Sequence, residues 1–130
     1  MPRHDGTVLR RLLAVAVASA AMACTSATPA SSPSVTPAAV ITITANGVSP
    51  KTVTVSRGSQ VQFVNNDSRP HTMSSNPHPE HSDCPEVNDV GYLAAGQARQ
   101  TGNLNTARTC GYHDHDLPAN TGLQGSIVIQ

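Results

Sequence analysis

The sequence predicts an all-β domain, a small antiparallel β-sandwich with Greek-key connections. The segments VITIT, TVTVS and VQFVN alternate β-branched and polar residues, which is typical of strands with one buried face. The turn-forming segments NGVSP and SRGSQ separate them. Because no stretch shows a helical period with caps and the strands are short and evenly spaced, a sandwich is favoured over a mixed α/β fold.

The rest of the domain divides into weaker strand candidates and one long loop. GSIVIQ, residues 125–130, is expected to form the last strand, and QARQTGNL and TARTC are weaker candidates on either side of a turn. Residues 68–96 are polar and rich in proline, and they contain three histidines and a cysteine. A loop this long in a small domain is usually functional or disordered, and these residue types favour function.

The first 24 residues predict a secretory signal peptide. Arginines precede an apolar run at residues 12–23, which is shorter than the roughly 20 apolar residues that a membrane-spanning helix needs. Cys24 follows small residues, as in the lipid-modification motif of bacterial lipoproteins, although Ala21 stands where leucine is usual. We expect an exported protein anchored to the membrane through a lipid on Cys24; the alternative is ordinary cleavage and free secretion.

Residues 25–39 consist of serine, threonine, proline, alanine and valine without charge, and we expect a flexible linker there. The folded domain is expected at residues 40–130. The 8 basic and 8 acidic residues of the chain balance, with no basic run in the domain, which excludes nucleic acid as a partner. The chain has no tryptophan, and its three other aromatic residues are too few for a stacking platform or a large aromatic pocket.

The segment RTCGYHDHD brings Cys110, His113 and His115 close together in sequence. A thiol and two imidazoles at this spacing indicate a metal site, a disulfide with incidental histidines, or a nucleophile with its base. A thiolate with two imidazoles is the ligand set that suits copper in electron-transfer sites.

The segment GVSPKTVTVSRGSQVQFVNNDSRPHT resembles the N-terminal half of cupredoxins, and CGYH followed by GLQGSIVI resembles their C-terminal half. The resemblance covers residues 40–130 and implies a blue-copper sandwich with His71, Cys110 and His113 as copper ligands. Leu123 stands where the family often has an axial methionine. The segment after His113 is also longer than in ordinary blue-copper proteins, so that His115 could replace or join His113.

A second group of candidate ligands, His78, His81 and Cys84, lies in PHPEHSDC. Three interpretations stay open: a second or expanded metal site, a solvated loop, or a Cys84–Cys110 disulfide. The disulfide is a serious alternative because oxidising compartments favour pairing, and only these two cysteines remain once Cys24 carries lipid. Such a bond would remove the thiolate that a blue site needs. The acidic neighbours of His115 are expected to be solvated or to orient an imidazole.

The sequence therefore predicts an exported copper-binding protein that transfers single electrons or handles copper at the cell envelope. Its partners would be a redox protein or a copper donor or acceptor, and we expect a monomer. The alternative is a metal-free cupredoxin-like binding module stapled by the disulfide. An enzyme is not expected, because a Cys–His pair alone is the minimum for a thiol hydrolase and no oxyanion-hole motif accompanies it.

Overall fold

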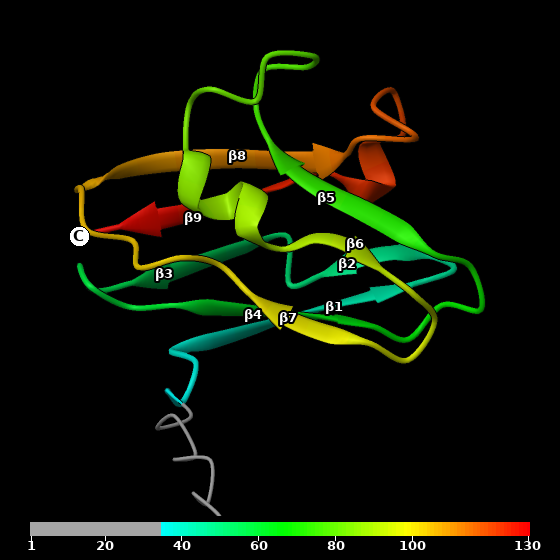
Figure 1. Ribbon diagram of the computed structural model, residues 1–130, viewed down its shortest axis with the longest axis horizontal. Coiled ribbons are helices and arrows are strands. Elements are labelled where there is room, and N and C mark those ends of the chain that lie inside the picture. Colours follow the sequence, from blue (N-terminus) through cyan, green and yellow to red (C-terminus); the bar gives the residue numbers. More distant parts are fainter. Residues whose placement is uncertain (1–34) are drawn as a thin grey trace, which may run out of the picture. The chain divides into compact units, whose positions relative to one another are not determined.

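The computed structural model describes residues 35–130; the predicted signal peptide, Cys24 and most of the predicted linker lie outside the described residues. Two stacked β-sheets form the domain (Figure 1). The four-stranded sheet has the order β2 (Gly47–Ser49), β1 (Ala39–Thr44), β4 (Val61–Asn65) and β7 (Ala98–Gln100). The five-stranded sheet has the order β3 (Thr52–Val55), β9 (Gly125–Ile129), β8 (Arg108–Asp114), β5 (His71–Ser75) and β6 (Gly91–Leu93).

The apolar positions of the alternating segments form the core between the sheets. Ile41, Phe63 and Ile127 are fully buried, and each belongs to a strand that the sequence predicted. The ring of Phe63 in the four-stranded sheet meets the ring of Tyr112 in the five-stranded sheet edge to face, with centroids 5.1 Å apart. The prediction of a two-layer, all-β domain is thus confirmed.

The antiparallel pairing expected of the sandwich does not hold for two strand pairs. Strand β1 runs parallel to β4, and β3 runs parallel to β9, so both sheets are mixed. Alternation reports which face of a strand is buried and carries no information on the direction of its neighbour, which is why the sequence could not reveal the parallel pairs.

Three strands lie where turns or loop were expected. Strand β2 occupies the predicted turn after β1, and β5 and β6 lie inside the predicted loop at 68–96. The inward positions of β5 are His71, Met73 and Ser75, a mixture that does not read as an apolar alternation. Among residues 35–130 the helices are the short 3-10 segments η1 (Pro85–Asp89) and η2 (Thr121–Leu123), and none is long and apolar enough to cross a membrane.

Candidate metal centre

Strand β8 carries the first seven residues of the RTCGYHDHD segment, and its two faces separate them; His115 lies in the turn that follows. It pairs regularly with β9 from Arg108 to Tyr112 and with β5 at its far end. Tyr112 points between the sheets, where it meets Phe63. Because successive side chains of a strand alternate, Cys110 and Asp114 share this inner side and His113 points to the outer side.

The structure joins Cys84 to Cys110 in a disulfide with a Cα–Cα distance of 5.7 Å, and both residues are fully buried. This corrects the expectation that Cys110 or Cys84 serves as a thiolate ligand. The expectation treated Cys110 and His113 as members of one turn, whereas three positions along a strand place them on opposite faces. The alternative held open at the sequence level, the disulfide, is the arrangement that the structure contains.

His71 also departs from the predicted ligand set. Its ring is 1% exposed and lies between two carboxylates, with Nδ1 at 2.6 Å from Asp114 Oδ2 and Nε2 at 3.1 Å from Asp67 Oδ2. Both ring nitrogens of His71 therefore contact carboxylates, and His71 is not part of the group of histidines that could hold a metal ion. Burial by itself raises the pKa of Asp67, but hydrogen bonds from His71 and Arg69 outweigh it and lower that pKa to about 2.

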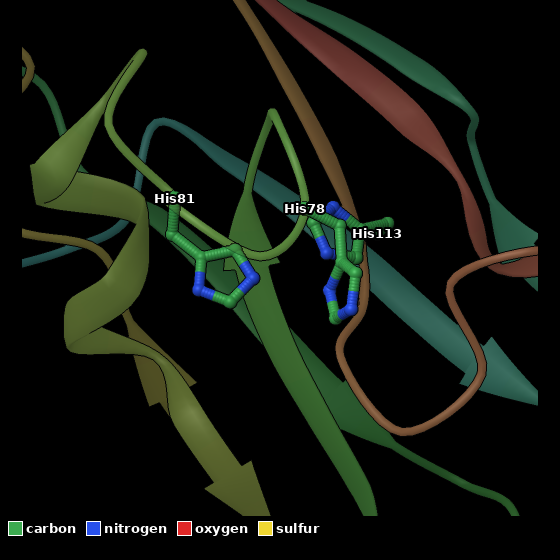
Figure 2. A group of neighbouring side chains, drawn as sticks. All are labelled: His78, His81 and His113. Carbon is green, nitrogen blue, oxygen red and sulfur yellow. The ribbon is translucent and has the colours of Figure 1, made fainter.

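Four other histidines converge on the outer side of the five-stranded sheet. One ring nitrogen from each of His78, His81 and His113 lies within 4.8 Å of the others. Figure 2 shows the three imidazoles close together, two from the loop after β5 and one from β8. His115 joins them, because its Nδ1 is 3.2 Å from His81 Nε2 and its ring centroid is 5.0 Å from that of His78. We call these four residues the histidine cluster.

The loop after β5 carries two members of the histidine cluster because it folds over β8. The backbone nitrogen of Asn76 donates to the backbone carbonyl of Gly111 at 3.0 Å, which continues the pairing of β5 and β8 into the loop. The side chain of Asn76 lies over Gly111, where any side chain would collide with Asn76 Nδ2. In Figure 1 this loop stands on the far side of the five-stranded sheet from β1 and β4.

Asn76 also sets the chemical form of His113. Its Oδ1 lies 2.8 Å from His113 Nδ1, and an amide oxygen only accepts, so Nδ1 carries the proton. The lone pair is therefore on Nε2, which is buried and has no hydrogen-bond partner among residues 35–130. A buried, unpartnered nitrogen is costly unless something binds it. Asn76 was not among the predicted site residues, because its role depends on the strand pairing that places it over Gly111.

The electrostatics of the histidine cluster favour the neutral form of two rings, those of His113 and His81. Burial lowers the pKa of His113, and repulsion from the charged forms of His81, His78 and His115 lowers it further. Burial and the neighbouring imidazoles lower the pKa of His81 in the same way, against an opposing effect of Glu80. A neutral imidazole is the form that binds a metal, so His81 and His113 are biased toward the form that a metal site needs.

Leu123, Met73 and Asp116 lie outside the histidine cluster. Leu123 and Met73 are buried in the hydrophobic core. Asp116, on the surface, accepts a hydrogen bond from Thr72 Oγ1 at 2.8 Å. Leu123, which the resemblance placed where cupredoxins often have an axial methionine, therefore does not lie beside the histidine cluster.

No family model matches the sequence, and no curated protein matches it. Solved structures do match. A purple cupredoxin from Nitrosopumilus maritimus is 20% identical, with 71% of this chain and 99% of that chain covered and a TM-score of 0.55. Oxidised plastocyanin from Dryopteris crassirhizoma is 13% identical, with 70% and 99% covered and a TM-score of 0.54. A mutant amicyanin described with Cu(I) is 19% identical, with 70% and 80% covered and a TM-score of 0.52.

These matches show a cupredoxin fold. The predicted resemblance is confirmed at the level of architecture, over the part of the chain that folds into the two sheets. Within this cupredoxin fold the donor atoms that converge are imidazole nitrogens, while the two domain cysteines are bonded to each other. The donor set thus fits a metal ion held by histidines and does not fit a site that needs a thiolate.

Proposed function

We propose that this chain is an exported copper-binding protein whose copper is held by the histidine cluster. It would carry single electrons or handle copper at the cell envelope, anchored through a lipid on Cys24. The observation that carries the proposal is the buried Nε2 of His113, whose ring lies beside those of His78 and His81 and which lacks a partner among the described residues. A metal ion would satisfy this nitrogen.

The donor chemistry supports copper among the metals that imidazole binds. Zinc, copper, iron and nickel all accept imidazole nitrogen, and divalent copper binds most tightly in the usual affinity order. The fold is that of an amicyanin described with Cu(I). Bound copper would supply a one-electron couple between Cu(I) and Cu(II). Without a thiolate, the copper-loaded protein should lack the intense thiolate-to-copper absorption of blue or red sites.

The position of the cluster suits exchange with a partner. His78 is exposed and His81 is half-buried, whereas His113 is buried beneath them. A redox protein or a copper donor or acceptor can therefore approach one edge of the site, while β8 holds the other. We infer a monomeric carrier rather than an enzyme.

Copper titration of the purified protein tests this proposal. We expect one Cu(II) per chain, tighter binding of Cu(II) than of Zn(II), and nitrogen couplings in the electron paramagnetic resonance spectrum. The variant His113→Ala should weaken binding by at least about 100-fold, since it removes a ligand rather than an outer-shell partner. Thr109→Ala, an exposed position on the same strand, is the matched control and should bind as the wild type does. Absence of binding in the wild type would refute the proposal.

The disulfide favours a second candidate, a metal-free binding module. A buried Cys84–Cys110 bond staples a small exported domain without any need for metal. The two candidates differ in one measurement, the copper content of the protein recovered from the envelope of cells grown with copper. The binding module predicts none, together with no copper uptake after purification.

A further inference from the structure

His71 lies on the inner side of β5, buried between Asp67 and Asp114, and the side chains of all three are at most 3% exposed. We propose that His71 is a positioning residue for the metal centre, a clamp that holds the segment carrying His113 and His115 in place, and that it is not a ligand. The inference rests on the proposed function and adds a residue to it.

The first step concerns Asp114, which stands between His113 and His115 in the chain. Its Oδ2 contacts His71 Nδ1 at 2.6 Å, and its Oδ1 accepts from the backbone nitrogen of Asp116 at 3.0 Å. The backbone nitrogen of His115 in turn donates to the carbonyl of Thr72 at 2.7 Å. Asp114 is the inward last residue of β8, so its carboxylate fixes the end of the strand that carries His113 and the turn that carries His115 without competing for their metal.

The second step concerns the other end of the clamp. Asp67 Oδ2 lies 3.1 Å from His71 Nε2, and the backbone nitrogen of Asp67 donates to Asn65 Oδ1 at 2.9 Å. Asn65 is fully buried at the end of β4, and its Nδ2 donates to the carbonyl of Leu93 at 3.1 Å. A continuous set of hydrogen bonds therefore runs from β4 in one sheet to the end of β8 in the other.

The third step explains why His71 does not bind the metal itself. Coordination would require one ring nitrogen to leave the carboxylate that it contacts, and that buried carboxylate would lose one of its hydrogen bonds. Losing a hydrogen bond to a buried charged group is costly, whereas His113 Nε2 has no partner to lose among residues 35–130. Orienting partners of this kind typically change metal affinity by 10- to 100-fold when mutated.

Nitrogen spectra of the intact protein separate the two roles. In long-range proton–nitrogen NMR of the full chain, addition of Zn(II) as a diamagnetic probe should shift the ring nitrogens of His113 strongly. The ring nitrogens of His71 should stay near their metal-free positions. A shift of the His71 nitrogens as large as that of His113 would identify a ligand and overturn the proposal.

Two variants measure the clamp. His71→Gln should bind Cu(II) about 10- to 100-fold more weakly, with unchanged stoichiometry and an unchanged number of coupled nitrogens by pulsed electron paramagnetic resonance. Loss of one coupled nitrogen would overturn the proposal. Asp67→Asn keeps the ring of His71 and changes only the carboxylate at its Nε2. This variant tests the clamp if His71→Gln does not fold. It should weaken binding in the same direction. Unchanged affinity in the variants would also overturn the clamp.

Metal-free hydrogen exchange keeps this test independent of copper. In the metal-free protein, Asp67→Asn should speed exchange of the His115 amide, which donates to Thr72. Val53→Ala, a core change on β3, is the control for general loss of stability and should leave copper affinity unchanged. If the wild type takes up no copper, the proposed function fails, and the exchange result alone still decides for or against the clamp.

Discussion

The inner and outer sides of β8 each have a buried histidine, His71 and His113, and use it differently. On the inner side, every polar candidate is paired: Cys110 with Cys84, and Asp114 with His71. On the outer side, imidazoles meet imidazoles, and the buried Nε2 of His113 has no partner among residues 35–130. The comparison teaches that the ability of a histidine to bind metal depends on what already occupies its nitrogens.

The largest effect should come from removing the inner disulfide. The double variant Cys84→Ser/Cys110→Ser opens a loop with a sequence separation of 26 residues. The chain-entropy model then predicts a loss of roughly 3–4 kcal/mol in the free energy of unfolding. Urea denaturation of the metal-free protein measures this loss.

The same double variant sharpens the comparison between the two sides. It removes both cysteine sulfurs of the domain, yet the histidine cluster keeps all its donor atoms, so we expect one Cu(II) per chain to bind still. Wild-type protein under non-reducing conditions should show no free thiol in a denaturing thiol assay outside Cys24. Loss of all copper binding in the double variant would mean that a sulfur is a ligand and that the division into two sides is wrong.

Sequence patterns predicted the strands whose apolar residues alternate, because burial on one face leaves a period of two in the sequence. They also identified His78, His81, His113 and His115 as candidate ligands. The grouping was wrong for His71 and Cys110. A Cys-x-x-His motif brings its residues together in a turn and separates them in a strand.

Whether the motif lies in a strand depends on β5, which alternation did not reveal. The sequence CGYHDHD has no apolar alternation of its own, and its extended form follows from the pairing of Asp114 with Met73 and of Tyr112 with Ser75. The odd spacing of Cys110 and His113, against the even spacing of His113 and His115, was the one available signal. It becomes informative only when the segment is known to be a strand.

A smaller effect is expected at Gly111, where the outer side depends on a missing side chain. In Gly111→Ala the new methyl group would collide with Asn76 Nδ2. Asn76 would have to move, and His113 Nδ1 would lose the acceptor that fixes its proton. We expect copper binding about 10- to 100-fold weaker, as for other partners that orient a ligand, measured by competition with a chelator.

A double-mutant cycle isolates this contact. Asn76→Ala removes the amide and should weaken copper binding by a similar factor. In the combined Asn76→Ala/Gly111→Ala variant the collision no longer exists, so its affinity should equal that of Asn76→Ala alone. Additive losses would show that Gly111 acts through something other than Asn76.

The smallest effect should be a difference in pH response between the two sides, measured on metal-free protein. The pKa values of His81 and His113 are lowered from 6.5, so near and below that pH the unfolded chain binds protons that the folded one does not. Stability should therefore fall as the pH drops below about 6.5. Asp67 acts at lower pH. Its pKa is lowered from 3.8 to about 2, so its contribution to stability persists above about pH 4 and is lost as the pH falls through about 2.

Urea midpoints between about pH 8 and about pH 5 therefore report the lowered pKa values of His81 and His113 and not that of Asp67. The variant His81→Gln/His113→Gln removes the two rings with lowered pKa values and should flatten the dependence. A wild-type midpoint that stays constant over this range would mean that the outer imidazoles accept protons as readily in the folded state as in the unfolded one. The outer side would then lack the bias toward neutral rings on which its readiness for metal depends.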